Sequence, residues 1–189
     1  MENKIKNIIS ESLTALKSLE EKTDDIQKIA EQVLSCLQEK GKLLICGNGG
    51  SAAQAQHMAA EIVGRFKKER RALPAIALST DTSIITSLSN DYSFERVFER
   101  QVEALGKKGD LLIMLSTSGN SPNLLKASRA AKEIGIKTAG ILGKDGGLLK
   151  KEADLSLVID SQDTAKIQEA HLIIIHAVCE LAEEGLSQV

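Results

Sequence analysis

The first forty residues place apolar side chains three or four positions apart, and this spacing predicts two amphipathic helices. Thr23 precedes the apolar positions of the second helix, and threonine is a favoured N-cap residue. We therefore expect residues 2–40 to form a helical pair whose second member is capped by Thr23. The apolar positions are Ile5, Ile8, Ile9, Leu13 and Leu16 in the first helix and Ile26, Ile29, Ala30, Val33 and Leu37 in the second.

Beyond residue 41 the helical spacing gives way to short apolar runs of strand length. Each run is bounded by Gly, Pro, Asp or Ser, and helical patterns separate most of them. This alternation predicts βαβ units, and hence an α/β fold with a five-stranded, mainly parallel sheet covered by helices on both faces. The runs are KLLIC (42–46), PAIALS (74–79), DLLIML (110–115), KTAGIL (137–142) and LSLVI (155–159).

The segment 163–184 reads as a helix that is apolar around most of its circumference. A helix of this kind is buried, either in the core or against another subunit. Together with the helical pair, it supplies more apolar helix than one five-stranded sheet needs. This surplus leads us to expect that residues 1–40 are used in oligomerisation. Because the chain shows no linker and no repeat, we expect a single domain over residues 1–189.

Composition excludes several classes of partner. A chain of 189 residues with a net charge of -2 gives no electrostatic reason to bind nucleic acid or an anionic membrane. Aromatic residues make up 2% of the chain, too few for base-stacking platforms. No apolar run approaches the ~18 residues of a membrane span, and the N-terminus lacks the apolar region of a signal peptide. These features predict a soluble cytoplasmic protein.

Three cysteines and one charge run have ordinary interpretations. Cys36, Cys46 and Cys179 are odd in number, widely spaced and set among apolar residues, which predicts buried, reduced thiols rather than a disulfide framework. The run KKERR (67–71) precedes the second expected strand, and we interpret it as a solvated loop.

Two loops have the composition of anion-binding sites. In an open α/β sheet, ligands collect where the carboxyl ends of strands lead into helices. The loop CGNGGS (46–51) follows the first expected strand, and its Ser51 adds a hydroxyl where a helix begins. The loop LSTSGNSPN (115–123) places four hydroxyls around Gly119, and Pro122 fits the first turn of the next helix. Such a lysine-free cradle suits a phosphomonoester, although each loop alone is also compatible with a polar cap.

A dinucleotide site is the main alternative for the first loop. Gly47, Gly49 and Ala52 match a G-x-G-x-x-A spacing. That motif requires an acidic residue about 20 positions further on, at the end of the second strand. The residue in that place is Asp81, well beyond the usual spacing. Neither loop contains G-K-[ST], so a Walker A loop is excluded as well.

The helix after the first loop carries a polar stripe. Ala55, Met58, Ala59 and Ile62 form its apolar face, whereas Gln54, His57 and Glu61 share another face. A histidine and a glutamate four residues apart can ligate one metal ion or act on one substrate. A solvent-facing contact between the two is the alternative.

The segment 163–184 offers further polar groups. Gln168 and His176 are separated by about 80° of rotation and ~12 Å of rise on a helix, a spacing that permits a shared site without establishing one. His176 follows three isoleucines, so we expect it to be buried. His171 does not share the face of His176, and we interpret it as an ordinary helix residue.

Four segments together resemble the phosphoheptose isomerases of the sugar isomerase (SIS) superfamily: GNGGSAAQAQHMAAE (47–61), SNDYSF (89–94), STSGNSPN (116–123) and AKIQEAHLIIIH (165–176). The resemblance covers essentially the whole chain. It implies a SIS fold and the conversion of sedoheptulose 7-phosphate to D-glycero-D-manno-heptose 7-phosphate, the entry to nucleotide-activated heptose for lipopolysaccharide core or other surface glycans. It also implies a homotetramer with active sites at subunit interfaces and one zinc ion per subunit.

The resemblance carries site residues over by motif. It implies zinc ligands at His57, Glu61, Gln168 and His176. It implies substrate contacts at Asn48, Gly49, Gly50, Ser51, Glu61, Asn90, Asp91, Ser116, Thr117, Ser118, Ser121 and Gln168.

An aldose–ketose isomerisation moves a proton between C1 and C2 through an enediol. Glu61 is then the expected base, and His176 the acid at the substrate oxygens. Zinc acting as a Lewis acid is an open alternative, because an imidazole nitrogen bound to zinc cannot also donate a proton. A SIS module that only binds a phosphosugar or the replication initiator, and an isomerase for another ketose phosphate, also remain open.

Overall fold

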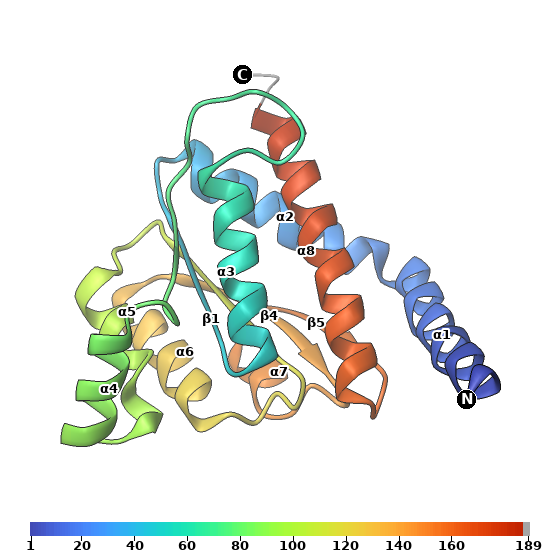
Figure 1. The fold of residues 1–189 in the computed structure, drawn as a ribbon. Helices are drawn as coiled ribbons and strands as arrows, with labels where there is room; N and C mark the ends of the chain where they lie inside the picture. The colour runs from blue at the N-terminus through green and yellow to red at the C-terminus, as the bar shows by residue number, and fades with distance from the viewer. Residues whose placement is uncertain (187–189) are drawn as a thin grey trace.

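Five parallel strands form one sheet in the order β2-β1-β3-β4-β5 (Figure 1). This computed structural model describes residues 1–186, so 187–189 of the expected domain lie outside the described residues. The expected five-stranded parallel sheet is confirmed. The strands are β1 (Leu43–Gly47), β2 (Ala75–Ala77), β3 (Leu111–Ser116), β4 (Lys137–Gly143) and β5 (Leu155–Ile159).

Helices cover both faces of the sheet, which confirms the α/β/α sandwich. Successive strand residues point to opposite faces, so Leu43 and Ile45 pack with α2, α3 and α8, whereas Leu44 and Cys46 pack with α5 and α6. The helices are α1 (Glu2–Lys17), α2 (Thr23–Gln38), α3 (Gly50–Val63), α4 (Thr82–Asp91), α5 (Glu99–Leu105), α6 (Pro122–Ile134), α7 (Leu149–Glu152) and α8 (Thr164–Leu186), with 3-10 turns η1 (Ser18–Lys22) and η2 (Phe94–Arg96).

The N-terminal helical pair forms as predicted, but its two members differ in burial. All five predicted apolar positions of α2 are buried. In α1 no residue is buried, and Ile5, Ile8, Ile9 and Leu13 are between 47% and 61% exposed. This helix extends away from the sheet (Figure 1) and contacts α8, where Lys166 Nζ donates to the Ile8 carbonyl (3.2 Å) and Ser12 Oγ (2.6 Å). The apolar face of α1 is therefore uncovered in the single chain.

The predicted N-cap of α2 is wrong. Thr23 is the first residue of the helix, the cap position is Lys22, and no side chain caps the helix there. Because η1 leads directly into α2, Thr23 already has helical backbone angles (φ -55°, ψ -40°). An N-cap residue needs an extended backbone to turn its side chain toward the first free N–H groups, and Thr23 has none.

The prediction for the cysteines is confirmed and that for KKERR is only partly right. Cys36, Cys46 and Cys179 are buried free thiols, and burial raises the pKa of Cys179 to about 12. Lys67, Lys68 and Glu69 expose their side chains as predicted.

Among the helices of residues 1–186, none has the length and apolar character needed to cross a bilayer.

The solvated-loop interpretation fails where the connection after α3 meets α8. The Glu183 carboxylate is buried and accepts hydrogen bonds from the backbone N–H groups of Phe66 (2.9 Å), Lys67 (2.7 Å) and Lys68 (2.8 Å). Arg70 Nε donates to the same carboxylate at 3.0 Å, and only 10% of the Arg70 side chain is exposed. A buried carboxylate requires such donors, so the loop is held down rather than free in solvent.

This arrangement predicts that part of the protein's stability depends on pH. Burial alone would raise the pKa of Glu183, but hydrogen bonds from the Phe66, Lys67 and Lys68 N–H groups and from Arg70 outweigh it and lower the pKa from 4.5 to about 2. A depressed carboxyl pKa stabilises the fold above the unfolded value and loses that effect as the pH falls toward 2. We expect Glu183→Gln to cost about 2 kcal/mol at pH 7 and much less near pH 2.

Urea unfolding of wild type and variant from pH 7 to pH 2 measures this difference. Glu180→Gln is the control, because Glu180 pairs with Lys67 at an exposed site (2.6 Å), where we expect less than about 1 kcal/mol. A gap between wild type and Glu183→Gln that stays constant over this pH range would refute the expectation.

Candidate active site

The two predicted anion loops lie side by side at one edge of the sheet. β1 pairs with β3, and Gly47 at the end of β1 is the register partner of Leu115. Because the strands are parallel, the loop from β1 to α3 and the loop from β3 to α6 emerge at the same edge. The chain places β2 on one side of β1 and β3 on the other, so this edge is the topological switch point where open α/β sheets bind ligands.

A reciprocal pair of amides joins the two loops. Asn48 Nδ2 donates to Asn123 Oδ1 (2.9 Å), and Asn123 Nδ2 donates to Asn48 Oδ1 (2.8 Å). Asn123 is buried in the first turn of α6. The sequence prediction included Asn48 but missed Asn123. The pair fixes the orientation of the Asn48 side chain next to the glycines of the first loop.

The hydroxyls of the second loop divide into two groups. Ser116 Oγ accepts from the Gly119 N–H (3.0 Å), and Ser118 Oγ accepts from the Asn120 N–H (3.2 Å), so these two shape the loop itself. The hydroxyls of Thr117 and Ser121 make no hydrogen bond within residues 1–186, and they remain available to a ligand. Gly119 has φ +65°, and a Cβ there would collide with the Gly146 carbonyl, so the loop requires glycine at this position.

Figure 1 shows α3 and α8 side by side, and the polar stripe of α3 faces α8. Gln54 Nε2 donates to the carbonyl of Gln168 at 2.6 Å. One turn further along, His57 Nε2 lies 2.9 Å from His176 Nε2 and 3.2 Å from Glu61 Oε1. The structure therefore brings the predicted stripe of α3 together with the His176 side chain and with the backbone of Gln168, rather than leaving an isolated His–Glu contact in solvent.

The side chains of His57, Glu61 and His176 form a group that fits a metal ion. One ligand atom from each lies within 4.8 Å of the others. Two imidazole nitrogens and a carboxylate oxygen are a usual donor set for zinc. Two nitrogens bound to one tetrahedral zinc at about 2.0–2.1 Å lie roughly 3.3 Å apart, close to the observed separation of the two Nε2 atoms. The donor atoms thus have the chemistry and the spacing of a metal site.

Three residues of α8 that the sequence analysis considered have distinct environments. His176 is half-buried rather than buried, because it faces the seam between α3 and α8, where the Phe66 ring lies against it with 5.6 Å between centroids. His171, interpreted from the sequence as an ordinary helix residue, is buried in the core, and burial lowers its pKa to about 4. The Gln168 amide lies against Gly50, where a Cβ would collide with it. Gln168 therefore covers the first loop.

Other predicted positions are placed as follows. Gly49 is the N-cap of α3 with φ +55°, and Ser51 is buried in the first turn of the helix. Asp81, the acidic residue of the dinucleotide alternative, instead caps α4 through its bond from the Ile84 N–H (2.9 Å). Asn90 and Asp91 are exposed at the end of α4 and bond to each other (2.9 Å). Within residues 1–186, no hydrogen bond connects them to the two loops.

Comparisons with known proteins give one consistent family. Residues 8–143 match the SIS domain family. The chain is 52% identical over 187 residues to a phosphoheptose isomerase of Trichlorobacter lovleyi, covering 98% of this chain and 95% of that protein. It is 58% identical over 158 residues to one of Pelobacter propionicus, with 84% of each covered. The structure of a phosphoheptose isomerase from Neisseria gonorrhoeae superposes with a TM-score of 0.92 at 41% identity, covering 97% and 98% of the two chains.

We expect the purified chain to bind one divalent transition-metal ion at His57, Glu61 and His176. Replacing either histidine by alanine removes one of the nitrogen ligands, so metal affinity should fall at least 10-fold. Equilibrium dialysis with elemental analysis measures stoichiometry and affinity. Glu69→Gln, on the exposed loop, is the control and should bind as wild type does. Undiminished binding by the double variant His57→Ala/His176→Ala would exclude this site.

Proposed function

The chain belongs to the SIS domain family and, within it, to the phosphoheptose isomerases, and from this we propose that it converts sedoheptulose 7-phosphate to D-glycero-D-manno-heptose 7-phosphate. One observation carries the proposal most strongly. The Glu61 carboxylate and the His176 imidazole meet in the seam between α3 and α8, and α3 starts at one of the two anion loops. A binding cradle and a pair of groups able to move protons thus share one helix.

The phosphate end of the substrate is assigned to the two loops. Backbone N–H groups at the starts of α3 and α6 favour an anion, and Thr117 and Ser121 add hydroxyl donors. We assign the remaining predicted contacts to the same substrate: Asn48, Gly49, Gly50, Ser51, Asn90, Asp91, Ser116, Ser118 and Gln168. Asn48 and Gln168 are the side-chain amides next to the glycine loop, where they can hydrogen-bond to sugar hydroxyls.

The proton transfer is assigned to Glu61 and His176. Glu61 removes the proton at C1 of the ketose and returns it to C2, while His176 exchanges protons with the oxygens at the same carbons. Glu61 Oε1 faces His57 at 3.2 Å, and Oε2 accepts no hydrogen bond within the described chain, so one oxygen of the carboxylate remains for the substrate. In the single chain 24% of the Glu61 side chain is exposed.

We also propose zinc, one ion per subunit, as the metal held by His57, Glu61 and His176. The resemblance to the phosphoheptose isomerases adds Gln168 as a fourth ligand, and in the single chain its amide lies against Gly50. Such a cation would stabilise the negative charge that develops on the substrate oxygens. Ligation to zinc would occupy the Nε2 atom of His176, so a proton-transfer role for His176 requires that it not be bound through that atom in the same step. Activity of zinc-free protein distinguishes these roles.

A binding-only SIS module is the alternative from a different class. The presence of His57, Glu61, Gln168 and His176 in one seam favours catalysis, because a module that only holds a phosphosugar has no use for a base and an acid. Incubation with sedoheptulose 7-phosphate and with shorter ketose phosphates identifies the substrate. The product would enter nucleotide-activated heptose synthesis for lipopolysaccharide core or another glycan, in the cytoplasm.

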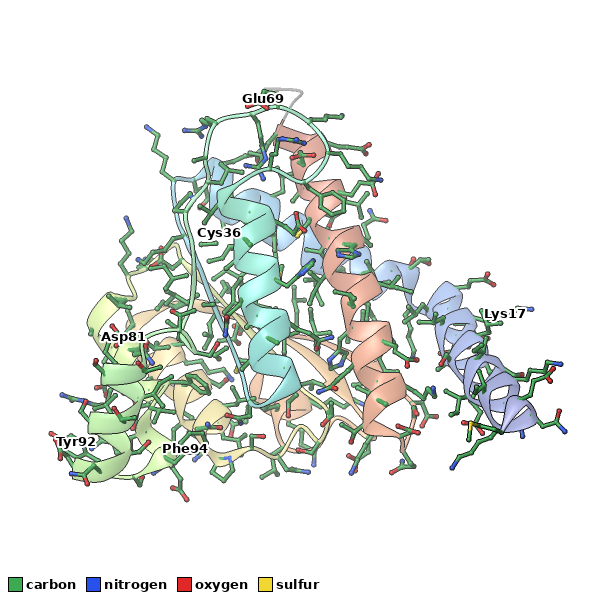
Figure 2. The ribbon with its side chains drawn as sticks, viewed as in Figure 1. Lys17, Cys36, Glu69, Asp81, Tyr92 and Phe94 are labelled. Carbon is green, nitrogen blue, oxygen red and sulfur yellow. The ribbon has the colours of Figure 1, made fainter. Side chains whose placement is uncertain are left out.

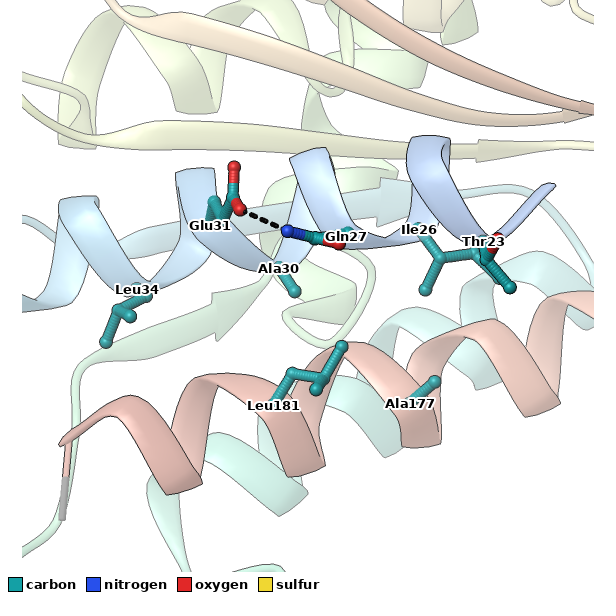
Figure 3. A pocket seen from close by; sticks show the side chains of 8 residues that line it. All are labelled: Thr23, Ile26, Gln27, Ala30, Glu31, Leu34, Ala177 and Leu181. Carbon is teal, nitrogen blue, oxygen red and sulfur yellow. Dashed lines mark hydrogen bonds between the residues drawn. The ribbon is translucent and has the colours of Figure 1, made fainter. Parts of the chain in front are cut away.

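We further propose a single SIS domain that assembles as a homotetramer through residues 1–40, with active sites at subunit interfaces. The uncovered apolar face of α1 supports this assembly, as does a groove of about 490 Å³ between α2 and α8 (Figure 3). Its apolar lining comes from Ile26, Ala30, Leu34, Ala177 and Leu181. Asn90 and Asp91 make no hydrogen bond to the two loops within residues 1–186, which also fits a site completed by a second copy.

Glu61→Gln should reduce kcat at least 1000-fold, because the amide keeps the shape of the side chain but cannot take a proton. Aldose formation from sedoheptulose 7-phosphate, followed by NMR, provides the measurement. Glu69→Gln controls for the loss of one carboxylate. Retention of more than a tenth of wild-type activity by Glu61→Gln would remove Glu61 as the base.

Ile9→Asp/Leu13→Asp should dissociate the tetramer, because two carboxylates would have to be buried in the interface. Light scattering measures the mass in solution, and circular dichroism checks that helix content is preserved. Glu11→Gln lies on the same helix and should leave the mass unchanged. A double variant that keeps the wild-type mass would exclude α1 from the interface.

A further inference from the structure

The ion pair between Arg70 and Glu183 ends on the helix that carries Glu61. Arg70 Nη2 donates to the Glu61 carbonyl (2.9 Å), and Nη1 donates to the Ile62 carbonyl (3.0 Å). Carbonyls in the last turn of a helix lack partners within the helix. The guanidinium therefore caps α3 at its C-terminal end while its Nε bonds to Glu183 on α8 (3.0 Å). The guanidinium of Arg70 therefore links α3 to α8.

The same ion pair reaches His176 through Phe66. Glu183 follows His176 by seven residues, or about two helical turns, so both lie on the same face of α8. The Phe66 N–H donates to Glu183 (2.9 Å), and the Phe66 ring packs against the His176 ring. Figure 1 shows this loop crossing over the C-terminal ends of α3 and α8, with Glu69 at its outer edge in Figure 2. Arg70 of this loop contacts the backbone carbonyl of Glu61, and Phe66 contacts the ring of His176. The loop therefore contacts two members of the metal-fitting group.

The opposite end of α3 is held by different contacts. There the first loop is fixed by the pairing of β1 with β3 and by the Asn48–Asn123 amide pair. The Arg70–Glu183 pair lies at the C-terminal end of α3, where Arg70 donates to the Glu61 and Ile62 carbonyls. A change in the pair would thus alter the spacing of the two helices near Glu61 and His176 and leave the anion loops as they are.

We propose that Arg70, Glu183 and Phe66 are positioning residues that set the separation of α3 and α8, so that Glu61, His57 and His176 converge on one ligand. This inference rests on the site of the proposed function. It assigns a functional role to Arg70, Phe66 and Glu183, which are not among the predicted substrate contacts. Positioning residues of this kind change metal affinity or turnover typically 10- to 100-fold.

The chain offers a matched control in a second buried carboxylate. Asp110 accepts from the backbone N–H groups of Lys42 (3.0 Å) and Lys107 (2.9 Å) and pairs with Lys42 Nζ (2.5 Å). It lies where β1 and β3 begin, at the edge of the sheet opposite the loops. Asp110→Asn therefore removes a comparable charge and comparable hydrogen bonds without touching the seam between α3 and α8.

The test compares Arg70→Lys, Phe66→Leu and Glu183→Gln with Asp110→Asn in the full chain. Arg70→Lys keeps the positive charge but loses the forked donors that reach the Glu61 and Ile62 carbonyls. If Glu183→Gln does not fold, Arg70→Lys and Phe66→Leu still test the proposal. We call Arg70→Lys, Phe66→Leu and Glu183→Gln the seam variants. In these variants we expect kcat for sedoheptulose 7-phosphate to fall 10- to 100-fold while KM stays within 2-fold. Zinc affinity, measured by chelator competition without substrate, should fall about 10-fold.

Asp110→Asn should keep kcat, KM and zinc affinity within 2-fold of wild type, even if it lowers stability by as much as the seam variants do. Equal losses of kcat and zinc affinity in Asp110→Asn would show a general effect of stability and overturn the proposal. Wild-type values in both Arg70→Lys and Phe66→Leu would overturn it too. If wild-type protein does not isomerise the sugar at all, the proposed function fails, and zinc affinity alone then decides the role of the three residues.

Discussion

The parallel pairing of β1 with β3 is the constraint on which the rest of the site depends. It places the ends of both strands at one edge of the sheet, so that two loops separated by more than sixty residues of sequence form a single cradle. Each strand is buried on both faces, and a shift in register would disrupt both apolar layers. The binding loops are thus placed by the hydrophobic core, and the Asn48–Asn123 pair adds local orientation.

The second requirement is the contact between α3 and α8. Each helix has an apolar face in the core, and between them a polar seam holds Gln54, His57, Glu61 and His176. Polar groups at such a contact need partners, and here they are largely partners to one another. Arg70 and Glu183 close one end of the seam, and Gln168 covers the glycine loop at the other. The same pair of helices therefore carries the anion-binding glycine loop at one end and the groups proposed to transfer protons further along.

Local patterns in the sequence account for the strands, the loops and the helices, since each depends on neighbouring residues. His57 and Glu61 could be paired in the same way, because four residues of helix fix their relation. The contact between His57 and His176 could not be predicted in this way. It depends on how α8 packs against α3, and the two histidines are 119 residues apart in the sequence. Arg70 and Glu183 were missed for a related reason. A charge run reads as solvated unless its buried partner is known, and that partner lies 113 residues away.

Two further differences between sequence and structure have local causes. Asn123 resembles an ordinary polar residue at a helix start, and only the adjacent loop reveals its amide partner. Thr23 has the identity of a cap but the backbone of a helix residue, because η1 leads directly into α2. In α1 the apolar pattern was correct, but a pattern does not say whether its partner is the same chain or another copy.

The central claim is that the seam and the two loops form one isomerase site working by proton transfer. It is tested most directly by incubating the wild-type protein with sedoheptulose 7-phosphate in deuterium oxide and following C1 and C2 by NMR. A carboxylate that takes up the C1 proton exchanges it with solvent, so the heptose 7-phosphate aldose should carry deuterium at C2. Absence of the aldose, or an aldose that retains only hydrogen at C2, would contradict the account.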